Sequence, residues 1–506
     1  MTLRVSNTLT RQKEPFQTVV PGKVGMYVCG PTVYKPSHVG HMVGPVIFDT
    51  VKRYLTYLGY QVTFVVNITD IDDKIINEAR KLNRDWKELA ESVTANYREC
   101  LQKLGVTSID HFPRATEHIP EILAMIQGLI DKGFAYPSAG DVYFDVTKDP
   151  DYGKLCNRKV EEMEQGDDVE GASRKRFKGD FALWKGAKPG EPKWDSPWGP
   201  GRPGWHIECS AMTMKLLGAT LDIHGGGLDL QFPHHENELA QSESFTGKPF
   251  VRYWMHNGLM KIRSQSRKIK DDPNAPEGEL EKMSKSLGNE IVVSKVLEKH
   301  SPETLRLLLL STHYRSPIEY SEDRLNELKR ALDGFQRFFE RYQRITGQRF
   351  QDLPAPTKRG EFRAEGPFLQ EVAQLRERFL ECMDDDFNTG GAIGVLYELL
   401  TALNRYADAE QLEAAAEKAA AAKQTFQRGV SVLRELSQIL GLFAAAPRKD
   451  SGSDQLVSGL MQLLIDLRAE CRKAKNFAMA DTIRQRLTAL GVTLEDRQGG
   501  TTWRVG

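Results

Sequence analysis

The chain has 506 residues, too many for one ordinary hydrophobic core, so two to four domains are expected. Its 69 basic and 69 acidic side chains balance, which excludes nucleic-acid binding through overall charge and leaves local basic patches for that purpose. No apolar run approaches the roughly 18 residues of a membrane-spanning helix, and the N-terminus lacks the apolar core of a signal peptide. A cytoplasmic protein without a membrane partner is therefore expected.

The first part of the chain has the pattern of a parallel α/β domain. Residues 23–29, KVGMYVC, are an apolar run that predicts a buried strand ending at Gly30. A helix is expected over 42–58, closed by Gly59, and a fully apolar strand over 62–66. This strand–helix–strand order predicts a Rossmann-like doubly wound parallel sheet.

Helices, an insertion and further strands are expected next. One helix is predicted from 71 to about 104 and another over 117–132, and the segment of about 110–200 is interpreted as an insertion in the α/β domain because glycine, proline and charged residues interrupt it. The sheet is expected to resume over three short segments, near 204–210, 221–224 and 251–260.

The C-terminal part is predicted to be mainly helical. Residues 294–345 have a helical pattern, and 368–442 form a helical module with an alanine-rich helix over 409–426. The tail predicts two helices and a hairpin that turns at Gly499 and Gly500. We thus expect an α/β domain, an α-helical bundle and a small α+β domain, over residues 1–320, 321–445 and 454–506.

The six cysteines do not form the pattern of a disulfide framework. Cys100, Cys382 and Cys471 lie in amphipathic helical sequence and are interpreted as structural. Cys29 and Cys209 differ because glycine, proline, histidine and glutamate surround them. In a reducing compartment, thiols of this kind are candidate metal ligands or reactive groups.

The run LDIHGGGLDLQFPHHENELAQSE concentrates glycines, histidines and carboxylates. Pro233 suits the first position of a helix, and such a helix would place His234 and Glu238 four residues apart on one face. The spacing alone favours a hydrogen-bonded histidine and a solvated glutamate, and a metal half-site is the alternative. Cys29 and Cys209 could complete the site, since two thiolates, one imidazole and one carboxylate suit zinc.

Two further motifs have the composition of a polyphosphate site. His38 and His41 flank Gly40 where the first strand is followed by the first helix, at a point where backbone N–H groups favour anions. Lys282 and Lys285 lie in the run KMSKS, which can clamp a polyphosphate. Taken singly, the first motif could be structural and the second a solvated charge cluster.

Together, the H-x-G-H and KMSKS motifs resemble those of class I aminoacyl-tRNA synthetases. The runs MYVCGPTVY, NITDIDDKI, GRPGWHIECSAM and DIHGGGLDLQFPHHENE are similar to cysteinyl-tRNA synthetases in particular, and the resemblance extends from Asn7 to about Trp503. It implies a class I catalytic domain in the first domain, a stem-contact and anticodon-binding bundle in the second, and anticodon recognition in the third. Asp496 and Trp503 fall in the hairpin of that third domain.

The resemblance also implies roles for individual residues. The zinc ligands would be Cys29, Cys209, His234 and Glu238. The catalytic residues would be His38, His41, Lys282 and Lys285. ATP would be bound by His38, Gly40, His41, Gly225, Gly226, Gly227 and Lys285. The amino-acid pocket would contain Thr69, Trp205, His206 and His224.

The implied reaction is the ligation of L-cysteine to tRNA(Cys) through a cysteinyl-adenylate formed from ATP. One zinc ion per subunit would bind the substrate thiolate, Mg²⁺ would accompany ATP, and the protein would be a monomer. Serine is nearly isosteric with cysteine, but its hydroxyl is a far poorer zinc ligand, so the metal would select the thiol. The absence of a recognisable editing segment agrees with this implication.

Two related functions are weighed against this one. A ligase that joins cysteine to an amino sugar in mycothiol synthesis shares the catalytic core but lacks the full tRNA-binding C-terminus, and a catalytically inactive paralogue would not need both intact motifs.

Two segments depart from the family pattern. Residues 261–281 are longer than usual before KMSKS, which we interpret as a solvated insertion rather than a tRNA contact, and residues 42–45 differ from the common glycine-arginine pattern.

Overall fold

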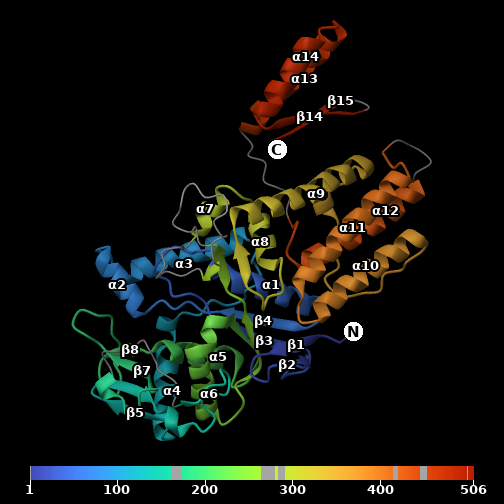
Figure 1. Ribbon diagram of the computed structural model, residues 1–506. Coiled ribbons are helices and arrows are strands. Elements are labelled where there is room, and N and C mark those ends of the chain that lie inside the picture. The colour runs from blue at the N-terminus through green and yellow to red at the C-terminus, as the bar shows by residue number, and fades with distance from the viewer. Residues whose placement is uncertain are drawn as a thin grey trace, which may run out of the picture. The chain divides into compact units, whose positions relative to one another are not determined.

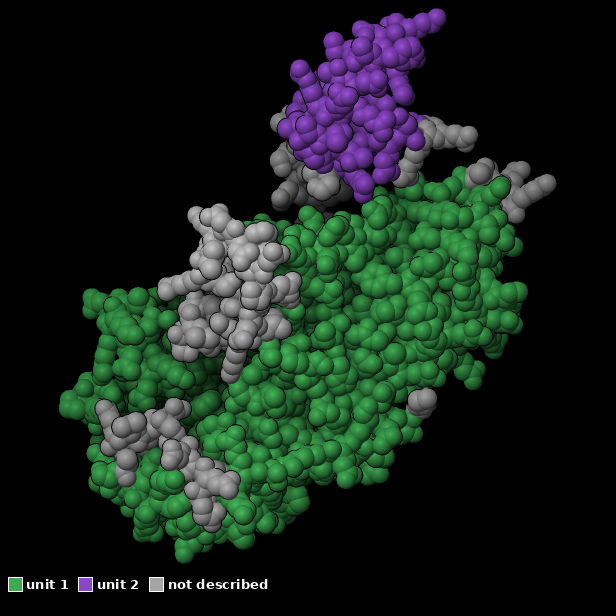
Figure 2. Space-filling view, in the orientation of Figure 1, with its two compact units in different colours: residues 1–444 green, residues 445–506 purple. Residues whose placement is uncertain are grey.

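The computed structural model describes residues 2–160, 172–263, 280–282, 291–413, 420–444, 453–497 and 500–505. The chain forms two compact units, residues 1–444 and 445–506, which Figure 2 colours separately. Among the described residues, no helix has both the length and the apolar character to span a membrane.

A four-stranded parallel sheet lies at the centre of unit 1 (Figure 1). The strands follow the order β10 (Val251–Asn257), β9 (Leu221–Gly227), β3 (Lys23–Val28) and β4 (Gln61–Val66). Every neighbouring pair is parallel. The expected strands over 23–29, 62–66, 221–224 and 251–260 are therefore confirmed, as is the Rossmann-like α/β class.

Both faces of this sheet are covered by helices, as a doubly wound fold requires. Met26 packs with α1 (Gly40–Tyr57), α3 (Trp86–Lys103) and α8 (Pro302–Leu310) in one core cluster. Its neighbour Tyr27 packs with α5 (Trp205–Leu217) and α6 (Glu236–Thr246) in another. This alternation follows from the two-residue period of a strand.

The helix expected from 71 to 104 is two helices, α2 (Asp73–Lys81) and α3. Asn83 takes a left-handed conformation with φ 49°, which ends α2. The Asp85 carboxylate then accepts hydrogen bonds from the N–H groups of Lys87 and Glu88 and caps α3. The capping aspartate thus overrides the continuous helical pattern.

The strand expected over 204–210 is wrong, because α5 occupies most of these residues. The strand here is β8 (Gly201–Pro203), which pairs with β7 (Phe181–Gly186). A Cβ on Gly204 would lie 2.0 Å from the Ala182 carbonyl oxygen, so glycine permits the close approach between the strand end and β7. The stretch mixes apolar and polar side chains, and almost all of them are buried in the helix.

The segment interpreted as an insertion contains α4 (Ile119–Asp131) and an antiparallel sheet with its own core cluster. The sheet has the order β5 (Ala135–Ser138), β6 (Asp141–Phe144), β7 and β8. At the N-terminus, β1 (Arg4–Asn7) pairs with β2 (Gln12–Pro15) in a separate two-stranded ribbon. Short 3₁₀ turns lie at Ala115–Glu117, Val146–Lys148, Ala172–Arg174, Leu228–Leu230 and Phe350–Asp352.

The helices expected over 294–345 are interrupted by a strand. Described elements here are α7 (Val293–Leu297), α8, β13 (Ile318–Tyr320) and α9 (Glu322–Thr346). Strand β13 pairs with β11 (Met260–Arg263), which also pairs with β12 (Leu280–Lys282).

A helical bundle follows, formed by α9, α10 (Pro367–Asp384), α11 (Thr389–Ala409) and α12 (Ala420–Ile439). The expected alanine-rich helix over 409–426 is wrong in its start, since α11 ends at Ala409 and α12 begins at Ala420. Residues 414–419 lie outside the described part of the chain.

Unit 2 contains α13 (Ser453–Lys473), α14 (Phe477–Ala489) and the hairpin of β14 (Val492–Arg497) and β15 (Gly500–Val505). The two helices and the hairpin match the expectation, and Gly499 lies outside the described residues. Two hydrogen bonds of 2.8 and 2.9 Å from Arg468 to Asp496 hold the hairpin against α13.

Candidate active site and metal centre

Four potential metal ligands, each from a different element, converge beside the sheet. Cys29 follows β3, Cys209 lies on α5, His234 lies in the turn before α6, and Glu238 is in the first turn of α6. One donor atom from each lies within 4.8 Å of the others. Cys29 Sγ is 3.8 Å from Cys209 Sγ and 3.4 Å from Glu238 Oε1, and His234 Nε2 is 3.0 Å from that same oxygen.

His234 does not lie in the helix that the sequence predicted. Residues Gln231–His235 form a π-helical turn in which Phe232 is extended, the Phe232–Pro233 peptide bond is cis, and α6 begins only at Glu236. Pro233 is thus not the first residue of α6. The four-residue separation still brings His234 against Glu238 because the turn is continuous with the helix.

Two histidines outside this set of four contact the candidate ligands. The Nδ1 atoms of His206 and His234 are 2.9 Å apart, so the Nε2 atom of His234 is directed into the cluster. The His224 Nε2 atom lies 2.8 Å from Glu238 Oε2. Trp205 stacks on His234 at 4.2 Å between ring centroids. Hydrogen bonds of this kind fix the tautomer and orientation of a metal ligand.

The electrostatics of the cluster fit a divalent cation. Burial raises the pKa of the Cys29 thiol well above its usual value. Burial also acts to raise the pKa of Cys209, but the hydrogen bond with Cys29 and the neighbouring His234 lower it to about 6. Although burial favours the neutral acid, His224 and His234 hold the pKa of Glu238 well below its usual range.

Burial alone would lower the pKa of His234, but Glu238 and Cys209 raise it to about 10. The buried site therefore gathers an imidazolium beside a thiolate and a carboxylate. Zinc ligands must be deprotonated, so binding of the ion would displace the protons of His234 and Cys29 and leave two thiolates, one carboxylate and a neutral imidazole. The donor set, its burial and its oriented histidine all fit zinc.

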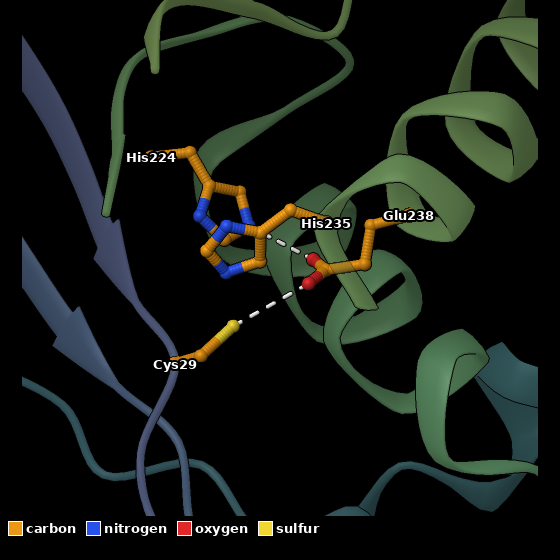
Figure 3. A group of neighbouring side chains, drawn as sticks. All are labelled: Cys29, His224, His235 and Glu238. Carbon is orange, nitrogen blue, oxygen red and sulfur yellow. Dashed lines mark hydrogen bonds and ion pairs between the residues drawn. The ribbon is translucent and has the colours of Figure 1, made fainter. Parts of the chain in front are cut away.

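A second combination of donors shares two of these residues. Cys29, His224, His235 and Glu238 also offer atoms within 4.8 Å of one another, and Figure 3 shows Glu238 linked to both Cys29 and His224. His235 Nδ1 is 2.8 Å from His256 Nε2. The first combination suits zinc better because it contains two thiols. Sequence reasoning missed His235, although it is the neighbour of His234 in the same motif.

A cavity of about 380 Å³ opens at the carboxyl ends of β3, β9 and β10. Ligands bind at this edge in open α/β sheets. Of the predicted site residues, the cavity is lined by Cys29, His38, Gly40, His41, Trp205, Gly226 and Gly227. It is also lined by residues that sequence reasoning missed, including Thr32, Tyr34, Lys74, Asn257 and Gly258. Asn257 ends β10, whereas the predicted strand ran to residue 260, so the sequence did not place this residue at a strand end.

The remaining predicted pocket residues do not line this cavity. Thr69 is 1% exposed and accepts a 3.3 Å hydrogen bond from the Asn67 amide. His206 and His224 contact the candidate ligands instead. Gly225 is covered by the Phe48 ring, which a Cβ at this position would approach to 2.1 Å. The lack of a side chain at Gly225 therefore allows α1 to pack closely on β9.

The H-x-G-H motif lies between β3 and α1, where the sequence predicted it. Helix α1 begins at Gly40, and the His38 and His41 rings stack with centroids 3.6 Å apart. The segment that follows KMSKS reaches this motif, because Val292 pairs with His38 and the Val39 N–H donates to the Ile291 carbonyl at 2.9 Å.

The second motif is largely outside the described residues. Lys285 lies among residues 283–290, which are not described, and Lys282 ends β12 without a described side chain. Most of the long loop over 261–281 is also outside, since only residues 261–263 and 280–281 of it are described.

Comparisons with known proteins agree with this geometry. The catalytic-domain model of class I (C) tRNA synthetases matches residues 15–330, a DALR domain matches 378–444, and a cysteinyl-tRNA ligase anticodon binding domain matches 460–504. Methionyl-tRNA synthetase of Mycobacterium tuberculosis has a similar fold, with a TM-score of 0.59 at 16% identity over 83% of this chain and 90% of that one. The fold is thus that of a class I aminoacyl-tRNA synthetase.

Full-length relatives narrow the class further. Cysteine–tRNA ligase of Pseudomonas aeruginosa is 47% identical over 509 residues and covers 99% of both chains. The enzyme of the same name from Geobacter sulfurreducens is 45% identical over 513 residues and covers 100% of both. The chain belongs to the cysteine–tRNA ligase family, which confirms the resemblance drawn from its motifs.

Proposed function

We propose that this protein activates L-cysteine with ATP and transfers the cysteinyl group to the 3′-terminal adenosine of tRNA(Cys). In the first step, a carboxylate oxygen of cysteine attacks the α-phosphorus of ATP, and the bond to pyrophosphate breaks. The observation that carries the proposal is that Cys29, a member of the donor cluster, lines the same cavity as His38 and His41. A thiol substrate and a nucleotide can therefore meet there.

The metal proposed for the cluster is zinc, held by Cys29, Cys209, His234 and Glu238. When bound, it supplies a Lewis-acid centre that prefers a thiolate to a hydroxyl. The chain's own contribution is orientation, because His206 fixes the His234 ring and His224 holds the second oxygen of Glu238.

ATP is proposed to lie over the start of α1. The backbone N–H groups there favour phosphate oxygens, and His38 and His41 stack at the edge of the cavity. Gly226 leaves no room for a side chain, since a Cβ would lie 2.9 Å from both His235 and Leu230. Lys282 and Lys285 are proposed to neutralise the phosphates with Mg²⁺, which the pairing of Val292 with His38 supports.

The tRNA is proposed to contact the two C-terminal parts. We infer that residues 1–320 form the catalytic domain with its insertion, 321–445 the stem-contact and anticodon-binding bundle, and 454–506 the anticodon-recognition domain. The hydrogen bonds from Arg468 and Thr501 hold the pKa of Asp496 below its usual value, so this carboxylate stays charged. Trp503 packs against the small core of unit 2. We further propose a cytoplasmic monomer, since tRNA and ATP are cytoplasmic substrates.

Cysteine-dependent exchange of labelled pyrophosphate into ATP tests the activation step directly. We expect exchange with cysteine and about 10⁴-fold less with serine at equal concentration, because serine lacks the thiolate that the metal selects. A zinc-replete preparation with no exchange would contradict the proposal. The amino-sugar ligase would also exchange pyrophosphate, but the two C-terminal family matches disfavour it.

A further inference from the structure

Helix α1 connects the nucleotide motif to the helical bundle within unit 1. Its 18 residues begin at Gly40 of the H-x-G-H motif and end at Tyr57, a span of about 27 Å. We propose that Tyr54 and Tyr57 are positioning residues that fix α1 against the bundle, so that their hydroxyl groups are needed for transfer to tRNA but not for cysteine activation. This inference rests on the proposed function.

The first contact joins α1 to α10. The Tyr54 hydroxyl donates a 2.6 Å hydrogen bond to Asp384 Oδ1, and it lies 3.3 Å from the Leu380 carbonyl oxygen. Tyr54 is fully buried and Asp384 is 3% exposed. Arg359 donates to the other Asp384 oxygen at 3.2 Å, so this carboxylate is held from two sides.

The second contact joins α1 to α12. The Tyr57 hydroxyl donates a 2.6 Å hydrogen bond to Glu435 Oε1. Arg376 of α10 donates to both Glu435 oxygens and to the Tyr57 hydroxyl oxygen, each at 2.9 Å. The Tyr57 carbonyl in turn accepts from the Arg359 N–H at 2.8 Å. One tyrosine therefore joins α1 to two bundle helices at once.

These contacts specify a position more than they add stability. Apolar packing between α1 and the bundle tolerates small shifts, whereas a buried hydrogen bond to a charged acceptor has one good geometry. The two tyrosines lie one turn apart on α1, so together they restrict both sliding and rotation of the helix. Asp384 and Glu435 both lie in the segment that matches the DALR domain.

The functional consequence follows from the distance along α1. Cysteine and ATP react at one end of the helix and need no contact with the bundle. A tRNA held by the bundle must bring its 3′-terminal adenosine to the same cavity, so a small displacement at Tyr57 changes where that adenosine arrives. Mispositioning of reactants by about 1 Å costs on the order of 100-fold in rate.

The test uses the double variant Tyr54→Phe/Tyr57→Phe in the full-length protein, which removes two hydroxyl groups and keeps both rings. We expect cysteine-dependent pyrophosphate exchange within about two-fold of the unmodified protein, and kcat/KM for tRNA charging at least about ten-fold lower. Single-turnover transfer from preformed cysteinyl-adenylate should slow by the same factor. A parallel loss of exchange and charging, or charging at the unmodified rate, would overturn the proposal.

A matched control is available in the insertion. Tyr136 is 5% exposed and donates a 2.6 Å hydrogen bond to Asp180, but it makes no contact with α1. Tyr136→Phe should therefore leave both pyrophosphate exchange and tRNA charging unchanged, or lower both by the same factor. If the double variant does not fold, the single variant Tyr57→Phe decides by the same two criteria. Failure of the unmodified protein to exchange or charge would instead refute the proposed function itself.

Discussion

Cys209 is fully buried, and its thiol meets both Cys29 and His234. As one of only two sulfur donors in the proposed zinc set, it gives the site the softness that favours zinc and a thiol substrate. Removing a soft donor leaves one thiolate, one imidazole and one carboxylate, a set that competes poorly for zinc.

We expect Cys209→Ala to lose zinc and cysteine affinity together. Metal analysis after dialysis should fall from about one zinc per chain to near zero, with KM for cysteine in pyrophosphate exchange raised at least about 100-fold. The control is Cys382→Ala, a half-buried thiol on α10, which should change neither quantity. Retained zinc with unchanged discrimination against serine would show that the ligand set is wrong.

At the residue scale, the sequence predicted which side chains belong to the site better than what each one contacts. The four proposed ligands come together, and His38, His41 and Trp205 line the cavity. His206 and His224 were expected in the amino-acid pocket, yet they contact His234 and Glu238. The π-helical turn Gln231–His235 brings His234 against His206, and spacing in the sequence does not reveal such a turn.

At the scale of elements, a buried ion pair holds α1 against α8. Arg306 is 1% exposed and donates to Asp49 Oδ2 at 2.5 Å, and also to the carbonyls of Leu104 and Leu440. Although burial acts to raise it, Arg306 and Arg53 hold the pKa of Asp49 below its usual value. This pair was not foreseeable, because its members are 257 positions apart in the sequence.

We expect Asp49→Asn to lower the free energy of unfolding by about 3–5 kcal/mol at neutral pH, since it leaves a buried guanidinium without its carboxylate. A carboxyl whose pKa is lowered on folding stabilises above its unfolded pKa of about 3.9 and loses that effect as pH falls through the folded value. Urea titrations should therefore show that the cost of the substitution shrinks below about pH 4.

The control for this prediction is Glu398→Gln, which breaks an exposed pair with Arg378 and should change the free energy of unfolding little. A cost for Asp49→Asn as small as that of the control would contradict the role given to the buried pair. Equal cost at pH 7 and pH 3 would contradict the pKa argument alone.

At the same scale, the main errors of sequence reasoning have local causes. The parallel strands were predicted because their apolar runs are buried on both faces. Residues 204–210 were predicted as a strand, but they mix apolar with polar side chains, and only their packing in α5 decides their structure. The break at Asp85 and the strand β13 arise from a cap and from pairing with β11, which periodicity does not record.

At the scale of the whole molecule, the sequence motifs and the family matches agree on the order of the parts, a catalytic domain followed by tRNA-binding parts. The order of these parts could be predicted because each has its own periodicity and composition. The contacts that fix α1 to the bundle could not be predicted, because Tyr54 and Tyr57 bind residues more than 300 positions away in the sequence. The proposed separation of cysteine activation from transfer to tRNA rests on that arrangement.

We propose that this chain attaches cysteine to tRNA(Cys) and selects cysteine by its thiol. The most direct measurement is charging of tRNA(Cys) by the zinc-replete, full-length protein, with labelled cysteine and labelled serine compared under identical conditions. We predict an ester of cysteine at the terminal adenosine and serine charging lower by about 10⁴-fold. Pyrophosphate exchange without charging, or comparable charging with serine, would contradict the account.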